Sequence, residues 1–149
     1  MPAFITFGRV LFAVLFIYTG ATKLFGIPAT ADLIAAKVMV PTLLAPYTAQ
    51  LETATGMSMP QLLAVAVGAL EVIAGLMIAL NFGARIFAFL LIIYVAVATF
   101  YFYDFWNPAT PENGKTLDAL KNLSIIGALF MIFGYGRGPR NLDPAYGDV

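Results

Sequence analysis

Four long runs of apolar residues alternate with shorter polar stretches along the chain of 149 residues. Each run has about the 20 residues that an α-helix needs to cross the hydrocarbon core of a bilayer. The hydrophobic positions therefore predict transmembrane helices over residues 4–24, 60–80, 84–105 and 117–135. Because short connections join antiparallel neighbours, we expect an all-α integral membrane protein, a four-helix up-down-up-down bundle. Residues 1–136 should form this single transmembrane domain, and residues 137–149 a polar C-terminal tail.

The first connection, residues 26–59, is longer than the others and unusually apolar. Ala31, Ile34 and Val38 share one helical face, and Thr30 precedes them in the position of an N-cap. We therefore expect a short interfacial helix in this first loop, folded back over the bundle. Such a helix serves either as a lid over a polar pocket or as a filler between the bundle and the lipid headgroups.

Composition supports a membrane protein and narrows its chemistry. The chain is 61% hydrophobic, and Ile86–Tyr103 carries no charge, whereas a soluble bundle needs a polar stripe on each helix. Eight basic residues balance eight acidic ones, so nucleic acid is not an expected partner. The sequence has no Cys and no His, which removes thiolate, haem and iron-sulfur ligation, and no carboxylate cluster suggests a metal. We therefore expect a chain with no redox centre of its own.

Glu71 lies near the middle of the second apolar run, about 16 Å along the helix axis. A charge near the bilayer centre costs about 2.5–3.5 kcal/mol on insertion scales, so Glu71 marks a candidate functional site. Ala64, Gly68 and Gly75 share its helical face and allow another helix to approach, which turns Glu71 toward the bundle interior. The simpler alternative is a buried carboxylate that only fixes helix packing.

Two basic residues, Arg9 and Lys23, share one face of the first predicted helix, near its opposite ends. Arg9 can extend to the nearer membrane surface, whereas the Cβ of Lys23 leans back toward the membrane interior. Counting 1.5 Å per residue from one boundary shared by all helices puts Lys23 about 2 Å deep. The same count separates Glu71 in depth from Arg9 by about 8 Å and from Lys121 by about 10 Å.

The bundle topology gathers further polar and aromatic residues at the face opposite the termini. Besides Lys23, this face receives Tyr103, Asp104, Trp106, Lys121 and Asn122. We hypothesise a polar pocket with Glu71 and Arg9 as its floor. Lys23 and Lys121 would stand at its mouth, where two ammonium groups favour an anionic or carbonyl ligand such as a quinone head group. Glu71 and Asp104 are the candidate catalytic residues, and the other polar and aromatic residues of the pocket would bind the ligand. An interfacial aromatic belt would explain the Tyr and Trp residues, but not Asp104.

Four segments, in one order, span nearly the whole sequence: GRVLFAVLFIYTGATKLFG, GALEVIAGLMIALNFGAR, YFYDFW and KNLSIIGALFMIFGYGRG. Together they resemble the DoxX-like family of small four-helix membrane proteins. The resemblance implies a bacterial-type inner membrane and membership of a membrane oxidoreductase system coupled to quinone, with soluble redox enzymes as partners. The family pattern is polar or aromatic at the positions of Arg9, Lys23, Glu71, Asp104, Trp106, Lys121 and Asn122. Where the family often has His, this chain has Tyr103, so no role that needs a His is expected.

Three functions remain open. The first is an accessory subunit of an oxidoreductase that binds quinone or a small ligand, with protons moving through Glu71. The second is a non-catalytic scaffold or assembly factor that docks a partner through the long loop and the aromatic belt. The third is a small permease, which would have to be a homo-oligomer because four helices enclose little space. Whether the chain takes part in catalysis is left open, at most as a membrane subunit of an oxidoreductase.

The distribution of basic residues gives the expected orientation in the membrane. Loop and tail positions place three basic residues on the side of the termini and two on the other side. Cytoplasmic loops carry the excess of Lys and Arg, so we expect a multi-pass protein with both termini in the cytoplasm.

Overall fold

The structure is a computed structural model that describes residues 2–39, 42–103 and 113–135. Within these ranges the chain is helical and has no strand. Its elements are α1 (Pro2–Phe25), α2 (Ile27–Lys37), η1 (Thr42–Leu44), α3 (Ala45–Thr55), α4 (Met59–Ala79), α5 (Ala84–Phe102) and α6 (Asn113–Tyr135). Four of these helices, α1, α4, α5 and α6, are long and apolar enough to cross a membrane. The prediction of an all-α protein with four membrane-spanning helices is confirmed.

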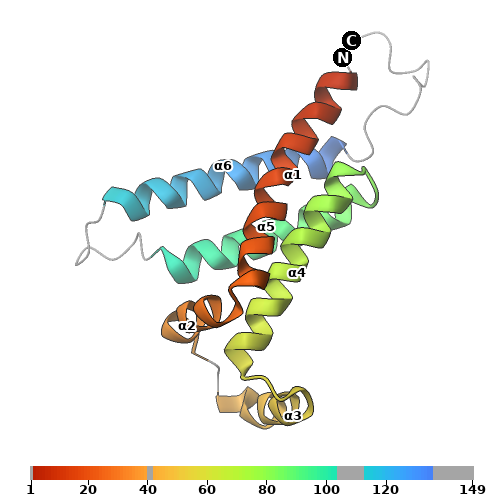
Figure 1. The fold of residues 1–149 in the computed structure, drawn as a ribbon. Coiled ribbons are helices and arrows are strands. Elements are labelled where there is room, and N and C mark those ends of the chain that lie inside the picture. The colour runs from red at the N-terminus through yellow and green to blue at the C-terminus, as the bar shows by residue number, and fades with distance from the viewer. Residues whose placement is uncertain (1, 40–41, 104–112, 136–149) are drawn as a thin grey trace.

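The four long helices pack as two pairs, α1 with α4 and α5 with α6. Figure 1 shows the second pair running across the first, with α4 and α5 connected by a short turn. In that turn Asn81 has φ 58° and Gly83 has φ 59°, a left-handed conformation that Asn and Gly tolerate best. The bundle is therefore two crossed hairpin-like layers, and α4 contacts both.

Small residues bring α1 and α4 close together. A Cβ on Gly20 would lie 2.7 Å from the carbonyl oxygen of Gly68, and a Cβ on Gly75 would lie 3.1 Å from the carbonyl oxygen of Ala13. Real Cβ atoms do not approach backbone oxygens at the shorter of these distances. The two backbones can therefore approach this closely only because glycine occupies these positions, as in other small-residue interfaces of membrane helices.

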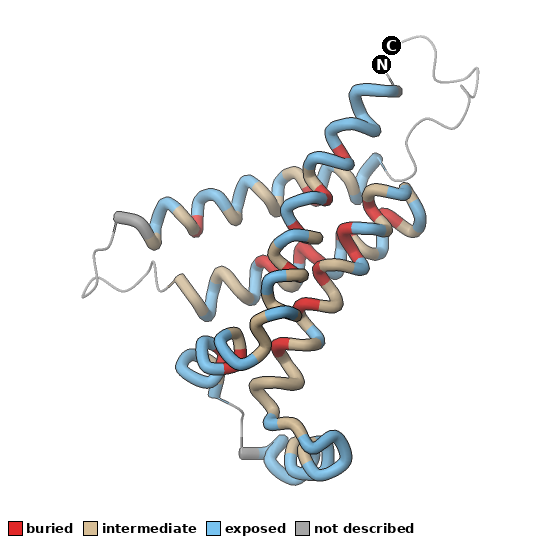
Figure 2. Tube along the Cα trace, viewed as in Figure 1, coloured by how far each residue is buried: buried red, intermediate tan, exposed pale blue. Residues whose placement is uncertain are grey.

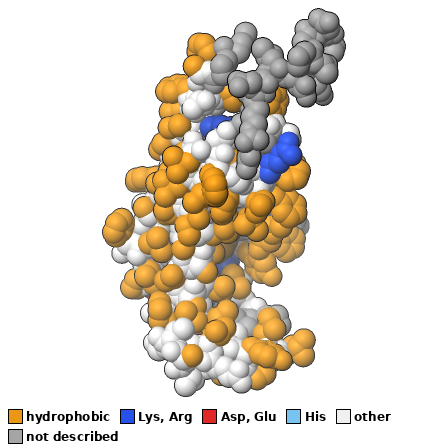
Figure 3. Space-filling model, turned by 90° about the vertical axis from the view of Figure 1, so that its right-hand side faces the viewer, with side chains coloured by type: hydrophobic (Ala, Val, Ile, Leu, Met, Phe, Trp, Pro, Cys, Tyr) orange, Lys and Arg blue, Asp and Glu red, His pale blue; other side chains and the backbone are white. Residues whose placement is uncertain are grey.

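Burial is concentrated where the two pairs cross, as Figure 2 shows. The core cluster consists of Phe16, Ala74, Ile78, Ala88, Leu91, Ile92, Val95 and Leu129. Outside this cluster the long helices expose many large apolar side chains, and Figure 3 shows such side chains over most of one face. An apolar exterior on helices of membrane-spanning length is the surface that lipid covers, so the protein is a multi-pass membrane protein in contact with the bilayer.

The first loop contains the expected short helix and a second helix that the sequence pattern did not predict. The expected helix is α2, but it begins at Ile27 after the N-cap residue Gly26, so the assignment of Thr30 as N-cap is wrong. Pro28 sits in its first turn, where proline is tolerated. The additional helix, α3, has no buried residue. Its sequence therefore needs no apolar face, and without such a face the helix could not be predicted from the pattern.

Most helix ends lie close to the predicted ones, and two differ noticeably. Helix α5 ends at Phe102, earlier than the predicted residue 105, and α6 begins at Asn113, earlier than the predicted residue 117. Helix α4 begins at Met59, where Ser58 and Gln61 form a capping box that satisfies backbone groups of the first turn. The predicted tail, residues 137–149, lies outside the described residues.

Candidate functional site

The candidate site is built around an ion pair between Lys23 of α1 and Glu71 of α4. The Lys23 Nζ atom donates to both carboxylate oxygens of Glu71, at 2.7 Å to Oε2 and 2.9 Å to Oε1. The side chain of Glu71 is 4% exposed and that of Lys23 is 26% exposed. Lys23 thus compensates the carboxylate inside the protein and does not reach out to the membrane surface.

The small residues of the α1–α4 interface place this ion pair. A Cβ on Gly20 would lie 2.8 Å from the Cβ of Glu71, so Glu71 leaves its helix directly against α1. Lys23 is one turn further along α1, and its side chain leans back toward the N-terminus of that helix. That lean carries the ammonium group to the carboxylate, in agreement with the side-chain direction that the sequence indicated.

The assumption that all helices start from one shared boundary is wrong. Gly20 lies opposite Gly68, and Arg9 donates a hydrogen bond to the Oδ1 atom of Asn81. With Gly20 opposite Gly68, the end of α1 stands about four residues, or about 6 Å, inside the start of α4. The first turn of α4 therefore extends past α1, and α4 also packs against α2. This offset closes about 6 Å of the roughly 14 Å by which the depth count had separated Lys23 from Glu71, and the long Lys23 side chain, leaning back along α1, spans the rest.

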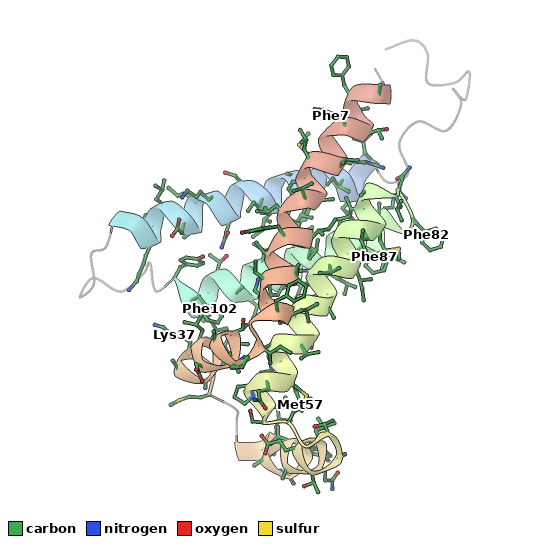
Figure 4. The ribbon with its side chains drawn as sticks, in the orientation of Figure 1. Phe7, Lys37, Met57, Phe82, Phe87 and Phe102 are labelled. Carbon is green, nitrogen blue, oxygen red and sulfur yellow. The ribbon has the colours of Figure 1, made fainter. Side chains whose placement is uncertain are left out.

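A cavity of about 680 Å³ opens beside the ion pair. It is lined by α1, α2, α4, α5 and α6, mostly with apolar side chains. Its polar lining residues are Thr19, Lys23, Thr30, Glu71, Tyr94, Tyr101, Tyr103 and Asn122. Helix α2 forms one wall, and Figure 4 shows the end of α5, marked by Phe102, close to α2, marked by Lys37. Helix α2 thus lies against the cavity, a position that fits both alternatives for the loop helix, the lid and the filler.

Tyr94 is a polar residue of the site that the sequence analysis missed. It lines the cavity, and its hydroxyl group faces the side chain of Glu71. The signal was present in the sequence, because Tyr94 is the first hydroxyl-bearing residue of α5 and lies well before the aromatic run at its end. A tyrosine so far from the membrane interface is not explained by an aromatic belt.

Two more of the predicted ligand-binding residues, Tyr103 and Asn122, also line the cavity. The Nδ2 atom of Asn122 donates to the Oγ1 atom of Thr99 at 2.9 Å. In turn, Thr99 donates to the backbone oxygen of Val95 at 2.6 Å. Asn122 therefore links α6 to α5 at the wall of the cavity.

The structure does not bring every predicted residue to this place. Lys121 does not line the cavity; its side chain is 62% exposed and pairs at 3.0 Å with Asp118 of the same helix. Arg9 is buried, but it bonds to Asn81 at the other end of α4 and does not line the cavity either. The floor of the cavity is thus formed without Arg9, and its mouth without Lys121.

The other predicted residues at the mouth, Asp104 and Trp106, lie outside the described residues. Within the described ranges, no group of three or more His, Cys, Asp or Glu residues could hold a metal ion. The site thus offers one ammonium group, one carboxylate, one amide and several hydroxyl groups. Such a set can bind a polar head group and can accept or donate a proton.

Comparison with known proteins supports the resemblance found in the sequence. The family model described as DoxX matches residues 4–104, which include the ion pair, Tyr94 and the turn between α4 and α5. Neither the curated proteins nor the solved structures contain a match. Because the matched region covers more than half of the sequence and contains three of its four membrane-spanning helices, the chain belongs to the DoxX family.

Proposed function

We propose that the cavity beside Lys23 and Glu71 binds the head group of a small carbonyl-bearing molecule such as a quinone. In this proposal the chain acts as an accessory membrane subunit of an oxidoreductase system. The observation that carries the proposal is the buried ion pair opening on a cavity of about 680 Å³. Ligand sites of proteins commonly have volumes of about 300–1,000 Å³ with a few convergent polar groups, which is the arrangement seen here.

The polar groups of the cavity suit a carbonyl oxygen. An ammonium group has three N–H donors, and the two contacts with Glu71 leave Lys23 a further donor for a ligand. The hydroxyl group of Tyr103 lines the same cavity and can also donate. Glu71 can accept or deliver the proton that accompanies reduction or oxidation of such a head group.

The accessory role follows from what the chain lacks. A sequence with no Cys and no His has neither the thiolate nor the imidazole ligands that hold most protein-bound redox centres. Electrons for a bound quinone would therefore come from a partner oxidoreductase. We further propose a bacterial-type inner membrane as the location of the protein and Asp104 as a second proton-handling residue.

Binding of a decyl-substituted benzoquinone to the purified protein in mild detergent tests this function. Stabilisation against thermal unfolding reports occupancy, because a ligand that binds only the folded state raises the melting temperature. We expect Glu71→Gln to weaken binding at least tenfold. Tyr94→Phe should weaken it about fivefold, as loss of one hydroxyl hydrogen-bond donor from the cavity predicts.

Matched controls are available on the outer surface. Asp32→Asn makes the same carboxyl-to-amide change as Glu71→Gln on the exposed side of α2. Tyr18→Phe removes a hydroxyl group from the exposed face of α1. Both controls should bind the quinone as the unmodified protein does. Equal binding by Glu71→Gln and Asp32→Asn would contradict the proposed function.

The scaffold alternative is supported by the same ion pair. Lys23 and Glu71 already satisfy each other, and within the described residues no buried side-chain polar atom lacks a hydrogen-bond partner. A pair that only fastens α1 to α4 would need no ligand. In that case replacing both residues by methionine should leave partner docking intact, whereas the proposed function requires that the double variant lose quinone binding.

A further inference from the structure

We propose that the cavity is filled from the lipid phase, through an opening bounded by α1, α2 and α5, by an uncharged lipid-soluble molecule. The inference rests on the proposed function, because it specifies the ligand of the same cavity. It also narrows the ligand class, since the sequence left both anionic and neutral carbonyl compounds open. Three features support it separately: the charge of the lining residues, the apolar character of the walls, and the position of the opening.

The charges of the lining cancel. Among the described residues that line the cavity, Lys23 and Glu71 are the charged ones, and they are 2.7 Å apart. The second cation that would favour an anion, Lys121, lies outside the cavity and pairs with Asp118. An anionic ligand would thus enter a low-dielectric space beside a buried carboxylate with no uncompensated cation to balance it. An uncharged head group avoids this repulsion and still finds hydrogen-bond donors.

The apolar lining of the cavity favours a ligand with an apolar tail. Around the polar groups the walls are formed by aliphatic side chains such as Leu15, Leu63, Val67, Val97 and Ile125. A water-soluble molecule that filled this volume would lose hydration against these walls without replacement. A molecule with a polar head and an apolar tail would instead bury its tail there, which is favourable.

The opening lies on the lipid-facing surface. Four of the lining residues are also exposed: Leu33 of α2 is 64% exposed, Val97 and Tyr101 of α5 are 50% and 44% exposed, and Leu15 of α1 is 41% exposed. Leu15 and Val97 belong to membrane-spanning segments. These residues therefore border the mouth of the cavity where the surrounding medium is lipid, and a ligand dissolved in the bilayer can enter without crossing water.

Two tail-matched probes test the charge of the ligand. Decyl-substituted benzoquinone is uncharged, whereas undecanoate at pH 8 has a tail of similar length and a negative head. Binding of each is followed by the rise in melting temperature of the reconstituted protein at a fixed ratio of probe to lipid. We expect the uncharged probe to bind at least tenfold more tightly than the anion. Binding of the anion with equal or greater affinity would overturn the inference.

A bulky residue at the mouth tests the route. Val97→Trp should weaken binding of the uncharged probe at least fivefold. Ile86→Trp is the matched control, since it adds the same side chain to an exposed position about three turns away on the same helix. Leu15→Trp narrows the opening from α1 and replaces the first variant if Val97→Trp does not fold. Unchanged binding in a folded mouth variant would exclude this entrance.

The outcomes separate this inference from the proposed function. If the unmodified protein binds neither probe, the proposed function fails as well. If the quinone binds, is lost in Glu71→Gln and is unaffected by the mouth variants, the site exists and only the lipid route is wrong. If undecanoate displaces the quinone efficiently, the site exists and only the assignment of an uncharged ligand is wrong.

Discussion

Lys23 and Glu71 stabilise the protein only as a pair. Replacing Lys23 with Met leaves the nearly inaccessible carboxylate of Glu71 without its cation, and loss of one partner of a buried pair costs about 3–5 kcal/mol. We expect Glu71→Met to cost less, because Lys23 is partly exposed to the cavity and can turn toward it. Reversible unfolding in mixed micelles measures both changes in the free energy of unfolding.

The double variant Lys23→Met/Glu71→Met is the decisive comparison. Two apolar side chains of similar size commonly replace a buried ion pair without loss of stability, so the double variant should be more stable than Lys23→Met alone. The coupling energy from this cycle should be about 2–3 kcal/mol. Additive effects of the two substitutions would show that the ion pair contributes nothing to the fold.

Asn81 combines two roles that separate substitutions can distinguish. Its φ of 58° lies in the left-handed region, and its side-chain oxygen accepts a hydrogen bond from buried Arg9. Asn81→Gly keeps the backbone conformation and removes only the side chain, whereas Asn81→Ala also adds backbone strain of about 1–2 kcal/mol. Thermal unfolding should therefore rank Ala as less stable than Gly. The reverse order would mean that the turn changes conformation in the variant.

At the level of the elements, the close contact of α1 with α4 depends on glycine at specific positions. Gly20→Ala would place a Cβ 2.7 Å from the Gly68 carbonyl oxygen, so the helices must separate and the ion pair beside them must lengthen. We expect a loss of about 2 kcal/mol or more, within the range found for overpacked interfaces. The melting temperature and the yield of folded protein report this loss.

Gly8→Ala is the matched control within the same helix. A Cβ on Gly8 meets nothing within 4 Å, so this variant should gain up to about 1 kcal/mol from the higher helix propensity of Ala. In lipid the gain in stability should be smaller, because each helix already forms before the helices associate. If Gly20→Ala were as stable as Gly8→Ala, the described approach of the two helices would be incorrect.

The elements themselves could be predicted because each depends on a local pattern. Runs of about 20 apolar residues identify spanning helices whatever their neighbours, and α2 had an apolar face that the sequence displayed. Helix α3 could not be identified in this way, because none of its residues is buried. Its one proline, Pro46, occupies the first turn, where proline is tolerated.

The site was predicted less completely because it depends on how the helices are offset. Glu71 and its glycine-lined face were visible in the sequence, but its partner was set by the offset between α1 and α4. That offset comes from which small residues meet, here Gly20 and Gly68, and helix lengths do not reveal it. The same limitation explains Lys121: position in the chain put it near the mouth, whereas rotation of α6 turns it outward.

For the whole molecule, the crossed arrangement of the two helix pairs accounts for the cavity. The pairs pack tightly where they cross, at the cluster that contains Phe16, Ala74 and Leu91. Away from that crossing α1 and α4 separate from the end of α5, and the space between them is bounded by α2. Helices that were parallel throughout would close this space. The cavity is therefore a consequence of the fold as a whole and not of any one helix.

Orientation in the membrane is the property of the whole molecule that remains to be tested, and the absence of native Cys makes the test direct. Ala54→Cys introduces a single thiol on the exposed surface of α3, and Phe82→Cys introduces one in the exposed turn between α4 and α5. The two positions lie at opposite ends of α4, so they lie on opposite sides of the membrane that α4 spans.

With both termini in the cytoplasm, a maleimide that cannot cross membranes should label Ala54→Cys in intact cells and Phe82→Cys only after permeabilisation. This orientation follows from the excess of basic residues near the termini. It also decides which compartment the face beside α2 and α3 meets, and hence on which side a soluble redox partner would have to dock. Labelling of Phe82→Cys alone in intact cells would reverse the orientation and place that partner in the cytoplasm, while equal labelling of both would contradict α4 as a membrane-spanning helix.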